Sequence, residues 1–310
     1  MLRLYTHEAC LAHQPGAGHP ESPARLAVVL RALDHDHYAA LDRCEAPRAT
    51  RAMLERAHDA DYLERIFAIA AESARSGETL HLDADTVLSP HSLEAALRAA
   101  GAVIAAVDAV LDGACRRAFC AVRPPGHHAT ATQAMGFCIF NSIAIGAAHA
   151  LAVHGLKRVA IIDFDVHHGN GTQDIATREP HVLYLSSHQS PLYPGTGAAS
   201  EHGSGNVFNA PLPPGTGSEE FRAAWRELLL PRLVAFRPQL ILVSAGFDAH
   251  RLDPLADMNL GSEDFAWLGA ELAALADAHA SGRLVSALEG GYSLTALAAA
   301  VPAYLAAQLD

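Results

Sequence analysis

Short apolar runs alternate with longer amphipathic stretches along nearly the whole chain, and this alternation restricts the fold more than any other feature of the sequence. The short runs are continuous and rich in β-branched residues, as is typical of parallel strands buried on both faces. They cover residues 2–5, 117–122, 158–164, 181–186, 239–245 and 283–288. Because strands that alternate with helices need right-handed crossovers, the sequence predicts a doubly wound α/β sheet.

The amphipathic stretches carry apolar residues at intervals of three and four, which is the period of a helix with one buried face. They cover residues 22–33, 59–75, 89–111, 139–153, 219–236, 262–279 and 294–305. Ser218 and Ser262 each precede two acidic residues, so we expect both serines to be N-caps. We expect the Gly-, Pro- and Ser-rich residues 190–217 to form a long functional loop within one domain that spans residues 1–310.

The composition argues against several classes of protein. Asp plus Glu number 34 against 22 Lys plus Arg, and a formal net charge of −12 gives no footprint for nucleic acid or an anionic membrane surface. Five scattered cysteines without a CxxC spacing predict reduced thiols in a cytoplasmic protein. The N-terminus is too polar for a signal peptide, and no apolar window is long enough to span a membrane.

Polar clusters follow five of the predicted strands. They are RPPGHHA (residues 123–129), DVHH (165–168), SSHQ (186–189), GFDAH (246–250) and EGGY (289–292). Ligands of open α/β sheets bind beyond the carboxyl ends of the strands. The five clusters therefore predict a functional site at that edge of the sheet.

The ionisable residues in these clusters favour a metal site. Asp165 and His167 are two residues apart on extended backbone, so their side chains can point to the same side, and Asp248 follows another strand. Two carboxylates and one imidazole would neutralise a divalent cation and leave a position open for water, as in catalytic zinc sites. A network of buried salt bridges at the strand ends is the alternative.

Histidine and tyrosine side chains in the same clusters suggest acid–base chemistry. His127 and His128 follow Pro-Pro-Gly, and one of them could act as a general base toward metal-bound water. Asp163 could orient a neighbouring imidazole, and Tyr292, after two glycines, could donate to a developing oxyanion. Ordinary loop histidines and a packed tyrosine are the alternatives.

Eight motifs occur in a fixed order along the chain: HPESPARL, DADTVLSP, RPPGHHA, GFCIFNSIAIGA, DFDVHHGNGTQ, YPGTG, SAGFDAH and EGGY. Together they resemble the zinc-dependent histone deacetylase and acetylpolyamine amidohydrolase superfamily over nearly the whole length, and within it the class II-like bacterial branch. The resemblance implies the arginase/deacetylase fold, a single domain with a central, mostly parallel sheet of about eight strands.

The resemblance also implies a role for each residue of the active site. It implies one zinc ion per chain, His128 as general base and acid, His127 as its electrostatic partner, and Tyr292 as the residue that polarises the acyl carbonyl. The zinc ligands would be Asp165, His167 and Asp248. A narrow acyl-lysine tunnel would be lined by Phe137, Tyr193 and Leu255, with Gly136 and Gly290 beside it and Asp85 at its rim.

One or two structural potassium ions are implied as well. The first would be held by Asp163, Ser186 and the main-chain oxygens of Asp163, Asp165, His167 and Ser187. The second would lie near Ala176, Glu179 and Val182.

Two positions distinguish this chain within the superfamily. Asn170 stands where class I enzymes carry an aspartate, which gives the ring of His128 a weaker partner, although class II members commonly share this residue. Tyr292 is not the histidine of the weakly deacetylating class IIa enzymes, so we expect genuine amidase activity.

The implied reaction is hydrolysis of an N-acyl amine. Acetyl-lysine in proteins is favoured over acetylpolyamines, because 310 residues leave little room for the rim insertion that usually accompanies polyamine specificity. A silent acyl-lysine reader and an arginase-like dinuclear hydrolase are further alternatives. The complete set of site residues argues against the reader, and Phe164 and Val166 at the positions between the aspartates and His167 argue against a second metal. The sequence leaves the oligomeric state open.

Overall fold

The computed structural model describes residues 2–309 and contains an eight-stranded sheet in which neighbouring strands run parallel. In order across the sheet, the strands are β2 (Asp42–Glu45), β1 (Leu2–Thr6), β5 (Arg117–Cys120), β10 (Leu284–Leu288), β9 (Leu240–Ala245), β6 (Val159–Asp163), β7 (Val182–Gln189) and β8 (Val207–Leu212). The prediction of an α/β fold with about eight mostly parallel strands is confirmed.

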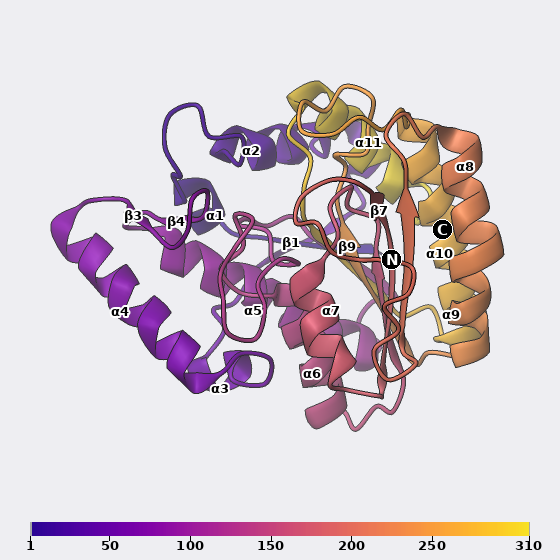
Figure 1. The fold of residues 1–310 in the computed structure, drawn as a ribbon, viewed down its shortest axis with the longest axis horizontal. Coiled ribbons are helices and arrows are strands. Elements are labelled where there is room, and N and C mark those ends of the chain that lie inside the picture. The colour runs from indigo at the N-terminus through magenta and orange to yellow at the C-terminus, as the bar shows by residue number, and fades with distance from the viewer. Residues whose placement is uncertain (1, 310) are drawn as a thin grey trace.

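Helices cover both faces of the sheet. In Figure 1, α2 (Pro23–Ala32) and α11 (Leu294–Ala306) lie above the strands, whereas α5 (Ser92–Leu111) and α6 (Ser142–Ala152) lie below them. The other helices are α1 (Ala9–Ala12), α3 (Arg51–Leu54), α4 (Ala60–Ser76), α7 (Asn170–Thr177), α8 (Ser218–Ala223), α9 (Leu230–Phe236) and α10 (Ser262–His279). The helix expected over residues 219–236 is divided, because a π-helical turn at Ala224–Leu229 separates α8 from α9.

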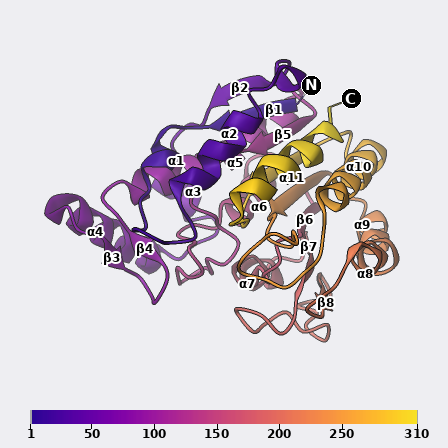
Figure 2. The same ribbon diagram turned by 90° about the horizontal axis from the view of Figure 1, so that it is seen from above.

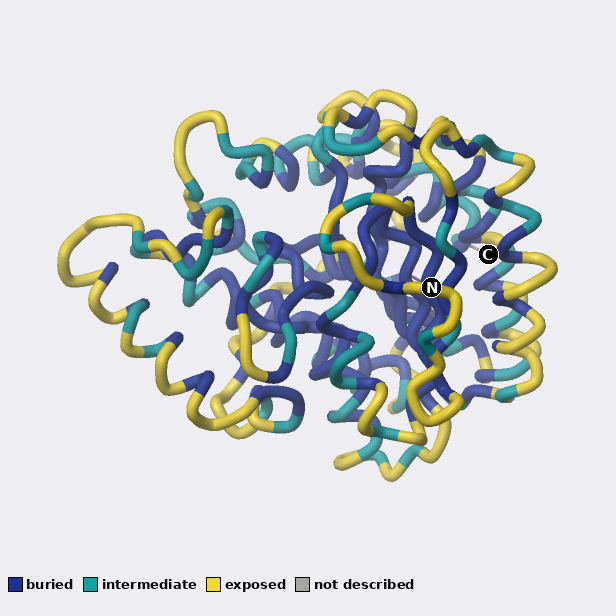
Figure 3. The backbone as a smooth tube through the Cα atoms, in the orientation of Figure 1, coloured by how far each residue is buried: buried dark blue, intermediate teal, exposed yellow. Residues whose placement is uncertain are grey.

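The core has two parts. The larger apolar cluster surrounds the sheet, whose strands are buried in Figure 3. A second cluster, which includes Leu63, Leu97 and Ile145, joins α4, α5 and α6. Helix α4 and the small hairpin β3 (Leu80–His81) and β4 (Val87–Leu88) project away from the sheet in both Figure 1 and Figure 2.

The strand order explains why distant polar clusters meet. The chain crosses from β5 to β6 and later returns to place β9 and β10 between them. As a result, the four central strands β5, β10, β9 and β6 are neighbours, and each is followed by one of the predicted polar clusters. The fifth cluster belongs to the carboxyl end of β7, which pairs with β6.

Strands β2 and β8 and helix α7 were missed by the sequence analysis. Strand β2 is an edge strand with the sequence DRCE, whose charged residues hide the strand signal. Strand β8 lies inside residues 190–217, so the expectation of one continuous loop there is wrong. Helix α7 has the polar sequence NGTQDIAT, which lacks a long apolar stripe.

The two predicted N-caps are each displaced by one residue. Gly261 is the N-cap of α10 and Gly217 is the N-cap of α8, whereas the serines that follow are the first helical residues. The N–H of Gly261 donates to Asp264 Oδ2 at 3.0 Å. The acidic residue of the first turn therefore caps the backbone from inside the helix, as in one half of a capping box.

The five cysteines are free thiols, as the sequence analysis predicts. Burial raises the pKa of Cys10 to about 11, so this thiol stays protonated at neutral pH. Within residues 2–309, no helix combines the length and the apolar character that crossing a membrane requires.

Candidate active site

Asp165, His167 and Asp248 lie together, as predicted, at the carboxyl ends of β6 and β9. The three side chains are buried, and one potential ligand atom from each lies within 4.8 Å of the others. His167 Nδ1 is 3.1 Å from Asp165 Oδ1 and 3.2 Å from Asp248 Oδ2. Among the described residues, histidines are the only ion-pair partners of the two carboxylates.

The charges of this group are not balanced by the protein alone. Burial, together with the neighbouring charge of Asp165, raises the pKa of Asp248 to about 7. Burial would lower the pKa of His167, but the two carboxylates raise it to about 10. A protonated His167 would offset only one of the two negative charges, and a charged His127 is shared between Asp165 and Asp163. A divalent cation would offset both carboxylates. The donor set of two carboxylate oxygens and one imidazole nitrogen fits a catalytic zinc site with an open position.

Main-chain groups hold the two carboxylates in place. The N–H of Gly290 donates to Asp165 Oδ2 at 2.7 Å, and the N–H of Val166 donates to Asp248 Oδ1 at 2.9 Å. A Cβ atom at Gly290 would overlap the carboxylates of Asp165 and Asp248. Glycine is therefore required at position 290 by the close approach of the EGGY loop to these two carboxylates.

His128 is held as a neutral base. Its Nδ1 is 2.8 Å from Asn170 Oδ1, an acceptor, so Nδ1 carries the proton and Nε2 keeps its lone pair. Burial, with the positive charges of His127 and His167, holds the pKa of His128 well below its usual range. Asn170 is the first residue of α7, which the sequence analysis did not predict as a helix.

His127 has the opposite charge preference. Its ring centroid is 4.0 Å from that of His128, and its Nδ1 donates to Asp163 Oδ2 at 3.1 Å. Burial would lower the pKa of His127, but Asp165 and Asp163 together raise it to about 10. The adjacent histidines thus form a charged and a neutral imidazole, and both serve one site because the segment between β5 and α6 is irregular.

Tyr292 is positioned by residues on three sides. The guanidinium of Arg25 lies 4.8 Å from the centre of the phenol ring, and the ring of Phe137 lies 5.8 Å away. Asp253 Oδ2 accepts from the N–H of Tyr292 at 2.7 Å. Burial raises the pKa of Tyr292, so its hydroxyl remains a proton donor.

Three positioning residues were missed by the sequence analysis: Arg25, Asp253 and Glu289. Arg25 donates to the carbonyls of Glu289 and Gly291 at 2.5 Å each. The carboxylate of Glu289 accepts from the N–H groups of Gly126 and His127 at 2.6 and 3.2 Å. Glu289 carries the clearest signal in the sequence, since it is an acidic residue at the end of a continuous apolar strand.

Three of the predicted tunnel residues, Tyr193, Phe137 and Gly136, lie against His128 or Tyr292. The ring of Tyr193 is 5.2 Å from that of His128, and Phe137 packs against Tyr292. Gly136 has a φ of +55°, and a Cβ atom there would collide with the ring of His128. Leu255 is half-buried, and its N–H donates to the carboxylate of Asp253. Asp85 lies next to this group, because His19 donates to its carbonyl oxygen and packs against Phe137 at 4.8 Å.

Comparison with known proteins identifies the family of this chain. The family model for the histone deacetylase domain matches residues 19–308. The chain belongs to the histone deacetylase family. The resemblance stated from the sequence motifs is therefore confirmed.

Relatives and a solved structure extend this result over nearly the whole chain. The chain is 44% identical to the histone deacetylase-like amidohydrolase of Pseudomonas aeruginosa, with 89% of this chain and 73% of the relative covered. It is 39% identical to a probable deacetylase of Archaeoglobus fulgidus, with 93% and 80% covered. The crystal structure of the HDA15 HD domain superposes with a TM-score of 0.90 at 32% identity, and covers 100% of this chain and 90% of that one.

The residues implied for the first potassium ion also lie together in this deacetylase-family chain. Asp163 and Ser186 are paired across β6 and β7. His188 Nε2 donates to the carbonyl of Gly197, so its Nδ1 accepts the hydroxyl proton of Ser186 at 2.9 Å. The lone pairs of Ser186 Oγ are therefore available to a cation. The side chain of Ser187 points to the opposite face of β7 from Ser186, where its hydroxyl accepts from Trp225, so only its main-chain oxygen could serve such a role.

His168 belongs to the predicted cluster but does not join the metal-ligand group. Its ring contacts Thr196 Oγ1 at 2.8 Å and Gln173 Oε1 at 2.9 Å. Burial lowers the pKa of His168 to about 3, so the ring is neutral. His168 therefore fastens the YPGTG loop to α7.

A second group with metal-ligating side chains consists of Asp108, His149 and His154. Both histidines donate from Nε2 to Asp108 Oδ1 at 2.7 Å. Arg56 donates to His149 Nδ1 at 2.6 Å, which places the ring proton on Nε2, the atom that would have to bind a metal. This group is accordingly a hydrogen-bond network that joins α5 and α6.

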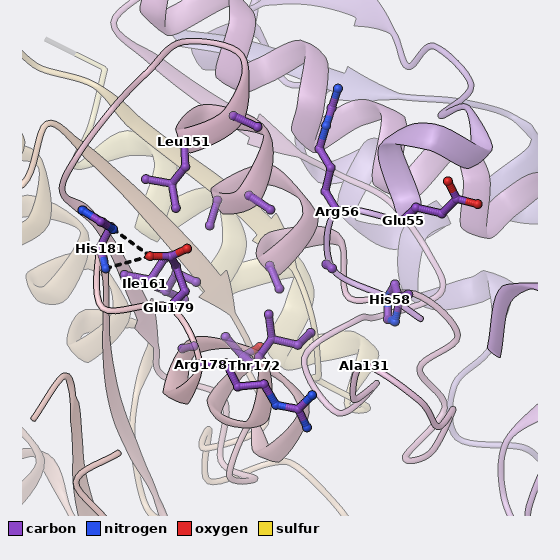
Figure 4. Close-up of a pocket in the computed structure, with 18 of the residues that line it drawn as sticks. Glu55, Arg56, His58, Ala131, Leu151, Ile161, Thr172, Arg178, Glu179 and His181 are labelled. Carbon is purple, nitrogen blue, oxygen red and sulfur yellow. Dashed lines mark hydrogen bonds and ion pairs between the residues drawn. The ribbon is translucent and has the colours of Figure 1, made fainter. Parts of the chain in front are cut away.

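A cavity of about 600 Å³ lies away from the catalytic residues, between α6, α7 and the segment that follows α3 (Figure 4). Alanines and Leu151 of α6 form its apolar side, and the ion pair of Glu179 and His181 stands at one edge. None of the predicted zinc ligands, catalytic residues or tunnel residues lines it.

Proposed function

We propose that this protein is a zinc-dependent deacetylase that hydrolyses acetyl-lysine side chains of proteins. The observation that carries the proposal is the pairing of an unbalanced Asp165–His167–Asp248 group with a neutral imidazole at His128 and a protonated phenol at Tyr292. These are the parts that amide hydrolysis needs: a cation site, a general base and an oxyanion donor.

A zinc ion held by Asp165, His167 and Asp248 would polarise the acyl carbonyl and lower the pKa of the attacking water. Nε2 of His128 accepts the proton of that water, because Asn170 keeps the ring proton on Nδ1. The charge of His127, fixed by Asp163, lies beside the anionic oxygen atoms that develop during attack.

Tyr292 acts on the opposite side of the acyl group. Its hydroxyl donates to the carbonyl oxygen as negative charge develops there, and Arg25 and Asp253 keep the phenol in place. His128 then passes its proton to the leaving nitrogen. The amide bond breaks, and the products are a carboxylate and a free amine.

The rim of the site favours a protein substrate over an acetylpolyamine. Leu252 and Leu294 are 52% and 42% exposed, and Asp253 between them binds the main chain of the loop that carries Tyr292. Tyr193 is 40% exposed next to the catalytic histidines. These exposed apolar side chains suit the residues that flank a lysine in a peptide, and Asp85 at the rim would hold the peptide main chain.

We also propose that one structural potassium ion binds between Asp163 and Ser186. Burial raises the pKa of Asp163, and a cation beside it would offset the desolvated carboxylate.

Residues 1–310 would act as a single catalytic domain located in the cytoplasm, as the composition indicates.

The test is a hydrolysis assay with an acetyl-lysine peptide and with acetylated putrescine or spermidine. The proposal predicts activity that a chelator abolishes and zinc restores, with a higher kcat/KM for the peptide. Asp248→Asn, which keeps the shape of the side chain but removes its charge, is the matched control and should be inactive. A higher kcat/KM for the polyamine would refute the substrate assignment, and activity unaffected by the chelator would refute the zinc mechanism.

A further inference from the structure

Three main-chain carbonyls converge on one side-chain nitrogen at the end of α7. Asn206 Nδ2 lies 2.8 Å from the oxygen of Ala176, 3.2 Å from that of Glu179 and 2.8 Å from that of Val182. These three residues are the ones for which the family resemblance implies a second potassium ion. The three carbonyl oxygens, called here the carbonyl cradle, are thus already contacted by a group of the protein itself.

The orientation of the amide is fixed by its other end. Asn206 Oδ1 accepts from the N–H of Ser204 at 3.1 Å and from the Ser204 hydroxyl at 3.0 Å. Reversing the amide would direct a donor at the Ser204 N–H and an acceptor at three carbonyl oxygens. Asn206 is also buried, with 7% of its surface exposed, so the nitrogen is held in the cradle.

We propose that the Asn206 carboxamide replaces the second potassium ion in this chain. The amide nitrogen bears two donor hydrogens with partial positive charge, and at 2.8–3.2 Å from all three oxygens it leaves no space for an ion among them. The oxygens of Ala176 and Glu179 also accept from the N–H groups of Glu179 and Val182, so together with Asn206 their acceptor capacity is satisfied without a cation.

This replacement matters for the active site because of the elements that it joins. Ala176 lies in the last turn of α7, whose first residue, Asn170, orients His128. Val182 is the first residue of β7, and Asn206 precedes β8, where its carbonyl accepts from the N–H of Tyr184. One side chain therefore fastens α7 to two strands, a task that a bound ion would otherwise perform.

The experiment uses the full chain and compares it with Asn206→Asp. The carboxylate of the variant has the size of the amide but adds a fourth oxygen to the cradle, so it should bind a monovalent cation there. Crystals of both proteins grown in Rb⁺ should show an anomalous peak at the cradle in the variant and none in the wild type. The melting temperature of the variant should rise further than that of the wild type when choline is exchanged for K⁺ at equal ionic strength.

Both proteins share any ion site at Asp163 and Ser186. A difference between their rises in melting temperature therefore reports on the carbonyl cradle alone. An Rb⁺ peak within the cradle of the wild type, with the amide displaced, would overturn the proposal. Absence of an added ion in Asn206→Asp would overturn it too, since the cradle would then not be a cation site. If Asn206→Asp fails to fold, Asn206→Ala replaces it. This variant removes the amide from the cradle, so it should also show an Rb⁺ peak there. The outcome is independent of the substrate that the enzyme hydrolyses.

Discussion

The carboxamide of Asn170 accepts the hydrogen bond that orients His128, and Asn170→Asp tests how the absence of charge at this position affects the basicity of the ring. In the wild type, the Nδ1–H of His128 donates to a neutral oxygen at 2.8 Å. The substitution keeps the shape and the acceptor but gives it a full negative charge, which stabilises the imidazolium. The hydrogen bonds that Asn170 Nδ2 donates are weak, because the one to the His128 carbonyl is long at 3.5 Å and the one to Met135 ends on a thioether, a poor acceptor. Replacing this nitrogen by oxygen therefore removes little stabilisation.

The size of the effect follows from the strength of the two hydrogen bonds. A neutral hydrogen bond contributes about 1 kcal/mol and one to a charged group about 2 kcal/mol or slightly more, a difference of about 1–1.5 kcal/mol. Since one pKa unit corresponds to about 1.4 kcal/mol, the pKa of His128 should rise by roughly one unit. The base must be unprotonated to act, so activity is lost as pH falls through this pKa. The acidic limb of kcat/KM should therefore move about one unit toward higher pH.

The assay is the pH dependence of kcat/KM for an acetyl-lysine peptide at saturating zinc. Asn170→Ala is the companion variant: it removes the acceptor, frees the tautomer, and should lower kcat without the upward shift. An acidic limb that stays in place or moves to lower pH in Asn170→Asp would show that another group is the base.

Three further predictions concern other parts of the site. Tyr292→Phe should lower kcat by roughly a hundred- to a thousandfold with little change in KM and full zinc content, since it removes one oxyanion donor; a near-normal kcat would mean that the phenol is merely packed. Asp248→Ala should lose zinc and activity together, and stoichiometric zinc by metal analysis would contradict the ligand assignment. Glu289→Ala should lower kcat at least about tenfold, because it releases the main chain of Gly126 and His127. Glu289→Gln retains an acceptor and should keep kcat close to that of the wild type. Equal losses of kcat in the two variants would instead assign the effect to the charge of Glu289.

The sequence is sufficient to predict the central sheet, because its strands are buried on both faces. The run at residues 239–245, for example, differs by one residue from β9 (Leu240–Ala245), whose residues are all buried. At the edges the same reasoning fails. Strand β2 needs only one neighbour, so its residues alternate between half-buried and exposed and its composition is that of a loop.

The meeting of the proposed metal ligands is predictable for a topological reason, whereas most of the residues that support them are not. Asp165 and Asp248 follow continuous apolar strands, and parallel strands present their carboxyl ends on one edge. Arg25, Asp253 and Glu289 act mainly through hydrogen bonds to the main chain. Such bonds depend on where loops pass in space and impose no spacing on the sequence. The roles of Arg25 and Asp253 therefore become visible only in the folded structure, whereas Glu289 at least stands out as an acidic residue at the end of an apolar strand.

The two adjacent histidines show how the assignment of acid–base roles depends on such hydrogen bonds. His127 and His128 are the same residue type, both buried, with ring centroids 4.0 Å apart. Burial would lower the pKa of both rings, but Asp165 and Asp163 raise that of His127. The hydrogen bond from Nδ1 of His128 to the neutral carboxamide of Asn170 also raises the pKa, yet burial and the charged neighbours keep the pKa of His128 well below its usual range. The charge of His127 itself contributes to the lowering at His128. Exchanging the carboxamide of Asn170 for a carboxylate places a negative charge beside His128. This charge stabilises the imidazolium and offsets the repulsion from His127, so the pKa of the base depends on the residue at position 170.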